Sequence, residues 1–69
     1  MYNRIKELRL ENNLTQEQIS KKLEISRITY SLYESSKRKV PLKILMKLAK
    51  EYNTSIYYLV GSTDTKIPN

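Results

Sequence analysis

Two helix start signals, at Thr15 and Ser26, constrain the fold of this 69-residue chain more than any other feature, because they leave only three residues between the two helices that they predict. The segment TQEQ begins at Thr15 and fits the capping box, in which a hydroxyl residue is followed three positions later by Glu or Gln. The helix that it starts is predicted over residues 16–23. The short segment EIS follows, and its Ser26 is a favourable N-cap for another helix over residues 27–35. The pattern therefore predicts two helices joined by a tight turn.

Helical periodicity also predicts a helix on each side of this pair. A first helix is expected near residues 2–12, because Ile5 and Leu8 lie on one stripe at helical spacing. Pro41 suits the first position of a fourth helix, where its missing N–H would have no partner in any case. The apolar face of that helix is expected to consist of Leu42, Leu45, Leu48, Ala49 and Tyr52.

The last predicted helix is short and precedes a tail. Ser55 is its expected N-cap, residues 56–60 form the helix, and Gly61 suits a left-handed C-cap. Because strand signals are nearly absent, we predict an all-α fold, a compact five-helix bundle in which a tight turn joins the second and third helices. We predict one domain over residues 1–61 and a flexible C-terminal tail over residues 62–69.

Composition argues against several classes of function. The chain has no cysteine and no histidine, so it lacks disulfides, thiolate metal ligands and the commonest general base. No arrangement of a nucleophile and a base is recognisable, and we predict no enzymatic activity, no cofactor and no metal. No apolar run approaches the roughly 18 residues of a membrane span, and the N-terminus lacks the apolar core of a signal peptide. We therefore expect a cytoplasmic protein without a membrane partner or a small-molecule ligand.

The positive charge is concentrated in one segment. The net charge of the chain is +6, and residues 37–50 carry six Lys and Arg side chains with no acid. Two interpretations of this segment are open at this point. It forms either a solvated helix face with a basic loop, or an edge of the molecule that binds a polyanion.

The predicted helix over residues 27–35 has two different faces. At about 100° per residue, Tyr30 and Tyr33 lie on one face and are expected to anchor the helix in the core. Ile28 and Leu32 lie on the opposite face, among hydroxyl and arginine side chains. That face is expected to pack on another element or to meet a partner that offers both apolar and hydrogen-bonding groups. The major groove of DNA is such a partner.

Two segments resemble a known family. LTQEQISKKLEISRITYSLYESSKRKVP resembles the helix-turn-helix core of the phage-repressor and Cro family, also called XRE-like. LKILMKLAKEYNTSIYYLVGSTD resembles the last two helices of that family, and the similarity covers about residues 4–64. The resemblance implies a lambda-repressor-like fold and a prokaryotic or phage-encoded transcriptional regulator. Such a protein would bind double-stranded DNA as a homodimer on a pseudo-palindromic operator.

The resemblance also implies roles for individual residues, with residues 27–35 as the recognition helix. The residues implied to contact bases are Arg27, Ile28, Thr29, Ser31 and Leu32. The residues implied to contact phosphates are Gln16, Ser26, Lys37, Arg38 and Lys39. The implied structural ion pair is Arg9 with Glu34, and the candidate dimer residues are Tyr57, Tyr58 and Val60.

Two residues depart from the family pattern, since Glu24 and Ser36 stand where the family commonly has glycine. If the backbone is left-handed there, a non-glycine residue costs about 1 kcal/mol. A second function also stays open, an antitoxin-like or anti-regulator module that keeps the fold and binds protein. Ile28 and Leu32 would then form an apolar contact patch.

Overall fold

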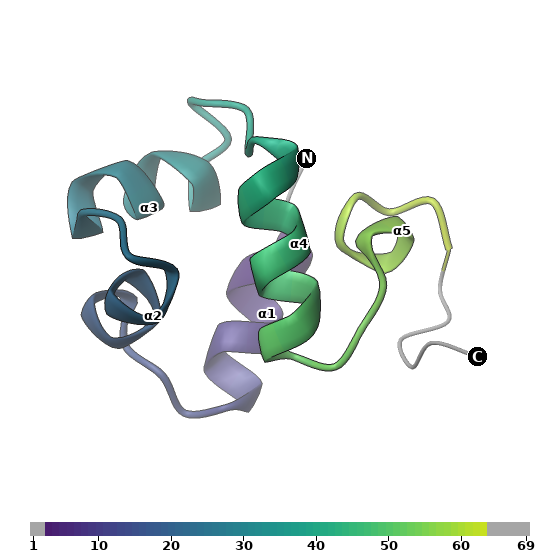
Figure 1. Ribbon diagram of the computed structural model, residues 1–69, viewed down its shortest axis with the longest axis horizontal. Helices are drawn as coiled ribbons and strands as arrows, with labels where there is room; N and C mark the ends of the chain where they lie inside the picture. Colours follow the sequence, from purple (N-terminus) through teal and green to yellow (C-terminus); the bar gives the residue numbers. More distant parts are fainter. Residues whose placement is uncertain (1–2, 64–69) are drawn as a thin grey trace.

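The computed structural model describes residues 3–63, which form five helices and no strand (Figure 1). The helices are α1 (Asn3–Glu11), α2 (Gln16–Leu23), α3 (Arg27–Glu34), α4 (Leu42–Glu51) and α5 (Ile56–Leu59). The predicted all-α fold with five helices is confirmed. Residue 2, the expected start of the first helix, and residues 64–69 of the expected tail lie outside the described residues.

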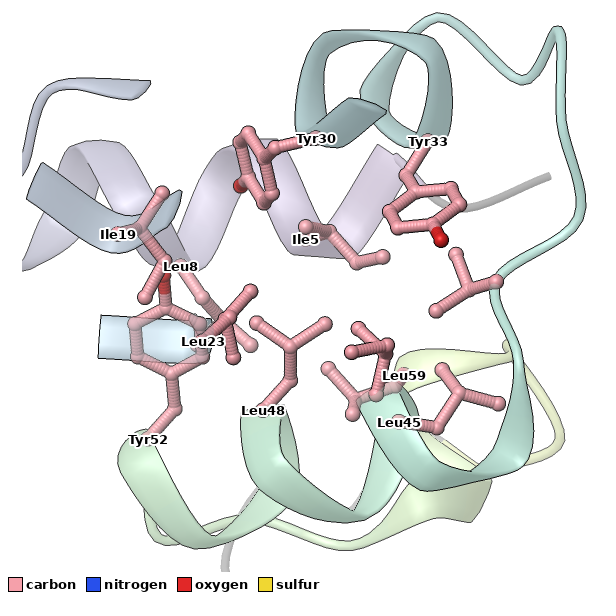
Figure 2. Close-up of a cluster of buried hydrophobic side chains, with 12 residues drawn as sticks. Ile5, Leu8, Ile19, Leu23, Tyr30, Tyr33, Leu45, Leu48, Tyr52 and Leu59 are labelled. Atoms are coloured by element: carbon pink, nitrogen blue, oxygen red, sulfur yellow. The ribbon is translucent and has the colours of Figure 1, made fainter. Parts of the chain in front are cut away.

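The helices surround one apolar core. In Figure 1, α4 runs in front of α1, with α2 and α3 on its left and α5 on its right. Close contacts join α2 to α3 and α4, α1 to α3 and α5, and α4 to α5. Figure 2 shows the side chains that these helices direct inward. The buried apolar residues are Ile5, Leu8, Ile19, Leu23, Tyr30, Tyr33, Val40, Ile44, Leu45, Leu48, Tyr52 and Leu59.

The N-terminal half of α4 differs from the prediction. Leu42 was expected in the core but is 63% exposed, whereas Ile44 is only 7% exposed. The buried face is centred near Leu48, and Ile44 lies about 40° from Leu48 around the helix while Leu42 lies about 120° away. Pro41 is the N-cap, with φ −62° and ψ 152°, and not the first helical residue. The expected face was therefore centred too far toward Leu42.

All five described helices end with a left-handed residue just beyond the last turn. The residues with positive φ are Asn13, Glu24, Ser36, Asn53 and Gly61. After each of them, the next N–H donates to a carbonyl of the last helical turn, as Lys37 N does to Leu32 O at 3.0 Å. This is the Schellman pattern, which satisfies carbonyls that the helix leaves unpaired. The left-handed geometry considered for Glu24 and Ser36 is confirmed.

Candidate nucleic-acid interface

The N-terminal end of α2 is held by the capping box that its sequence predicts. Thr15 Oγ1 accepts from the N–H of Gln18 at 3.0 Å, and the Thr15 N–H donates to Gln18 Oε1 at 2.8 Å. This reciprocal pair places Gln16 at the first helical position, half-buried on the side of α2 that meets α3. The Gln16 side chain therefore lies next to the N-terminus of α2, which carries a partial positive charge.

Ser26 and Thr29 form the cap of α3. The Thr29 N–H donates to Ser26 Oγ at 3.1 Å, and the Ser26 hydroxyl donates to Thr29 Oγ1 at 2.8 Å. Ser26 is exposed and Thr29 is half-buried. Both residues, which the family resemblance assigns to DNA contacts, thus also hold the start of α3 in place, so their substitution would affect helix stability as well as any contact.

The outer face of α3 brings together the five residues implied to contact bases. Arg27 and Ile28 are exposed, and Ile28 retains 70% of its accessible surface. Ser31 and Leu32 are half-buried. On the inner face Tyr30 is fully buried, which fixes the rotation of α3 about its axis. The exposed side chains are therefore directed away from the core by packing on the opposite side of the helix.

A basic loop follows α3 and leads to the N-terminal end of α4. Its cations Lys37, Arg38 and Lys39 are all exposed. The Lys37 and Arg38 N–H groups both donate to the Leu32 carbonyl, at 3.0 and 3.3 Å, which holds the first half of the loop against α3. Val40, 5% exposed, anchors the other end in the core. The backbone of the loop is thus tied at both ends while its charged side chains extend into solvent.

An ion pair between Arg9 and Glu34 connects α1 to α3. Arg9 Nε donates to Glu34 Oε2 at 2.6 Å, Arg9 Nη2 donates to Oε1 at 3.3 Å, and the two side chains are 11% and 5% exposed. Arg9 Nη1 also donates to the Leu14 carbonyl at 2.9 Å, and Gln16 Nε2 donates to Glu34 Oε1 at 3.2 Å. The pair therefore extends into a network that orients the Gln16 amide.

The environment of this network sets the protonation of its members. Burial opposes ionisation of Glu34, but hydrogen bonds from Arg9 and Gln16 outweigh it and hold the pKa of the carboxyl below its usual value. The hydrogen bond to Glu34 raises the pKa of Arg9 further. Burial, together with the nearby Glu34 charge, raises the pKa of the Tyr30 hydroxyl. Glu34 and Arg9 are accordingly both charged near neutral pH.

An open hollow beside this network was not found by sequence reasoning. We call it the α1–α3 hollow, and it is lined by Lys6, Gln16, Ser31, Glu34 and Ser35. Lys6 is exposed and lies one turn before Arg9 on α1. That spacing of three residues is the signal from which Lys6 could have been placed beside the Gln16 network. The hollow combines a cation, an amide and two hydroxyls with a carboxylate that Arg9 already neutralises.

Not all cations of residues 37–50 face outward. Lys47 Nζ donates to the Leu23 carbonyl at 3.3 Å and lies 3.9 Å from a Glu24 carboxylate oxygen. Lys47 therefore caps the C-terminal end of α2 from α4, where a cation is favourable next to the helix dipole. The charge of this segment is divided among the exposed loop, the exposed Lys43 and Lys50 of α4, and the structural contact of Lys47.

The residues proposed for a dimer surface have different environments. Tyr57 is 70% exposed and Val60 is 37% exposed. Tyr58 is half-buried, and the Arg4 guanidinium lies 4.2 Å from the centre of its ring. Arg4 Nη1 donates to the Tyr58 carbonyl at 3.0 Å and also to the Thr63 carbonyl. Tyr58 thus takes part in a contact within the chain that joins α1 to the end of α5.

Two other kinds of feature are absent from the part of the chain that the structure describes. None of the helices over residues 3–63 is long and apolar enough to cross a membrane. The same residues contain no group of three or more Asp, Glu, His or Cys side chains placed to hold a metal ion.

Comparison with known proteins identifies the family. A family model described as helix-turn-helix matches residues 5–59. The uncharacterized HTH-type transcriptional regulator YobD of Bacillus subtilis (strain 168) is 38% identical over 65 residues, 94% of this chain and 58% of its own length. The cryptic phage CTXphi transcriptional repressor RstR of Vibrio cholerae is 34% identical over 64 residues, 93% of this chain and 58% of its own.

A shorter archaeal relative is covered more fully. The uncharacterized HTH-type transcriptional regulator MJ0272 of Methanocaldococcus jannaschii is 41% identical over 56 residues, which are 81% of this chain and 85% of that protein. The chain spans 58% of the length of the Bacillus and Vibrio relatives. No solved structure matches the chain. The matched family model and these relatives show that the chain belongs to the XRE-type helix-turn-helix family, as its sequence pattern predicted.

Proposed function

We propose that this chain is a sequence-specific regulator of transcription that binds double-stranded DNA with α3 in the major groove. The observation that carries the proposal is the outer face of α3, where Arg27 and Ile28 are exposed in the first turn while the three exposed cations of the basic loop follow the other end of the helix. An arginine can bind guanine with two hydrogen bonds, and the flanking cations suit the phosphates on either side of the groove. That the Vibrio relative is named a phage transcriptional repressor supports this assignment.

Phosphate contacts are proposed at both ends of the helix-turn-helix. At the N-terminal ends of α2 and α3, the proposed contacts are Gln16 and Ser26. Beyond the C-terminal end of α3, they are the cations of the basic loop over residues 37–39. The Gln16 amide has two N–H groups, and because one donates to Glu34, the other is available in a fixed direction. A phosphate at this point would also meet the N-terminal end of α2, which favours an anion.

The regulator is proposed to bind as a homodimer in the cytoplasm, with one α3 per half-site. Two recognition helices one DNA turn apart would read a pseudo-palindromic operator. A single module of this size buries too little surface on DNA for tight binding, which favours a dimer. Tyr57 and Val60 supply exposed apolar surface for such a contact. No catalytic role, cofactor or small-molecule ligand is proposed.

The test is selection of bound sequences from a pool of random duplexes, followed by mobility-shift titrations over a series of salt concentrations. Enrichment of a two-fold symmetric sequence is expected. The logarithm of the binding constant should fall steeply with the logarithm of salt, by roughly 0.9 for each phosphate neutralised. A chain that enriches no sequence and binds duplex DNA weakly at low salt would contradict the proposal.

A second candidate, binding to a protein partner, is favoured by one observation. Ile28 is 70% exposed and lies one helical turn from half-buried Leu32, so the outer face of α3 carries apolar surface. Apolar contact with a protein would depend only weakly on salt. The same titration therefore separates the two candidates, because only binding to a polyanion gives the steep slope.

A further inference from the structure

The side chain of Ile28 is the most conspicuous apolar group on the outer face of α3. It is 70% exposed, equal to Tyr57 and more than the other exposed large apolar side chains of the described residues. Leu32, one turn further along the same face, is half-buried. Ile28 therefore makes the outermost apolar contact that α3 can offer to a partner.

The position of this side chain is well defined. Ser26 caps α3 two residues before Ile28, and fully buried Tyr30 anchors the helix two residues after it. An isoleucine in a helix has one strongly preferred χ1 rotamer because its Cβ is branched. The position of the Ile28 side chain relative to the helix axis is consequently fixed.

The chemistry of the major groove determines what such a side chain can read. The groove edges of guanine, adenine and unmodified cytosine present hydrogen-bonding groups, for which an aliphatic side chain has no partner. Thymine also presents its C5-methyl group, the one apolar feature of the groove, and 5-methylcytosine presents the same group at the same place. Within the DNA-binding function proposed above, on which this inference rests, we propose that Ile28 selects a C5-methylated pyrimidine in each half-site.

The charges near Ile28 favour DNA over a protein as the occupant of this face. Arg27 adjoins Ile28 and is exposed, and the cations of the basic loop follow the other end of the same helix. This outer face therefore places one apolar side chain between positive charges. A phosphate backbone on each side of a methyl group in a groove has the complementary arrangement.

The experiment begins with a duplex enriched from the random pool by the full chain. Each thymine is replaced singly by uracil, which removes only the C5-methyl group and leaves the hydrogen-bonding edge unchanged. We expect one position per half-site at which the replacement weakens binding by about threefold to tenfold, the effect of losing one buried methyl group. A duplex with a 5-methylcytosine–guanine pair at that position should also bind more tightly than the same duplex with unmodified cytosine there.

Variants of the chain assign this effect to Ile28. Ile28→Ala should bind the thymine and uracil duplexes equally at that position, whereas Ile28→Val should keep part of the difference. Leu42→Ala, at a comparably exposed leucine on α4, should show the full difference between thymine and uracil. Circular dichroism and retained binding to random duplex DNA show that the Ile28→Ala chain is folded.

Two negative results have different meanings. If the wild-type chain binds its selected duplex but the uracil effect is absent, or persists unchanged in Ile28→Ala, the assignment of Ile28 is overturned and the proposed function stands. If no duplex is enriched and binding lacks a salt dependence, the proposed function itself fails and this inference fails with it.

Discussion

At the scale of single residues, Glu34 connects three helices. Its carboxylate accepts from Arg9 on α1 and from Gln16 on α2 while its own backbone ends α3. A buried ion pair is not in itself strong evidence for stability, because desolvation opposes the attraction of the charges. Removing one partner is costly, however, because the remaining charge stays buried alone.

Replacing Glu34 by glutamine should therefore lower the free energy of unfolding by about 3 kcal/mol at pH 7. Urea denaturation followed by circular dichroism measures this change. Glu51→Gln is the matched control, because its partner Lys22 lies 3.4 Å away in a pair whose side chains are 35% and 47% exposed. Such an exposed pair contributes about 0.2–1 kcal/mol. Equal losses in the two variants would contradict the role assigned to Glu34.

The same pair predicts how stability changes with pH. The pKa of Glu34 is lower in the folded chain than its ordinary value of 4.5, so its contribution is present above that value. The contribution disappears as the pH falls below 4.5 and through the lower pKa of the folded state. The wild-type chain should thus lose more stability between about pH 5 and pH 3 than Glu34→Gln does, as measured by urea denaturation at each pH.

At the scale of the helices, a repeated feature is the left-handed residue at each C-terminal end. Asn13 and Asn53 tolerate this geometry better than other non-glycine residues, and Gly61 adopts it without strain. Glu24 and Ser36, with φ of 60° and 62°, carry the cost of a side chain in the left-handed region. These two turns are therefore points at which the native sequence is less stable than it could be.

Ser36→Gly should raise the free energy of unfolding by about 0.5–1 kcal/mol, since relief of the left-handed strain exceeds the added entropy of the unfolded chain. The neighbouring variant Ser35→Gly is the control, because Ser35 has φ −82° and has no such strain to lose. Ser35→Gly should instead lower stability. Thermal and urea denaturation of both variants measure the difference, and stabilisation by both or by neither would argue against the strain.

The element α1 is predicted to take part in DNA binding through Lys6 in the α1–α3 hollow. Lys6→Gln should weaken binding to random and selected duplexes alike, and it should reduce the salt slope by about 0.9, the value for one phosphate contact. Lys50→Gln removes another exposed lysine, at the C-terminal end of α4, and should leave the slope unchanged. Mobility-shift titrations at several salt concentrations compare the two variants. Identical slopes would remove Lys6 from the interface.

At the scale of the whole molecule, the small size of the domain favours the proposed homodimer. Exposed apolar residues on α4 and α5 include Leu42, Met46, Tyr57 and Val60. Arg4 connects α1 to the end of α5 through the Tyr58 ring and the Tyr58 and Thr63 carbonyls. These contacts hold the backbone next to Tyr57 in place. A rigid apolar surface is better suited to self-association than one that must first be ordered.

Tyr57→Ser should weaken the proposed homodimer at least tenfold, because it removes the largest exposed apolar side chain of α5. Leu10→Ser is the control, since Leu10 on α1 is 55% exposed and lies on another element. Sedimentation velocity over a range of protein concentrations gives the dimer dissociation constant of each variant. A dimer that responds to Leu10→Ser and not to Tyr57→Ser would place the contact elsewhere.

Most features that depend on a few neighbouring residues were predicted correctly, although Pro41 is the N-cap of α4 and not its first helical residue. The capping box at Thr15, the Ser26 cap and the anchoring of Tyr30 each follow from residues within one or two helical turns. A cap hydrogen bond is determined locally, because it joins residues three positions apart in the chain. Spacing also defines which residues share a helical face, but not how far around the helix burial extends, as Leu42 shows. The helix order follows from the same local signals taken together, and the family was predicted from the resemblance of two segments to a known family.

Features that depend on packing between helices were not predictable in the same way. Leu42 was expected in the core but is exposed, while Ile44, for which no environment was predicted, is buried. Lys47 caps α2, and Lys6 lies beside Gln16 in the α1–α3 hollow. Each of these depends on which helix lies opposite, and residues far apart in the chain meet there only after the core has formed. The local pattern thus defines the helices and their caps, whereas burial against neighbouring helices selects which side chains remain outside to meet a partner.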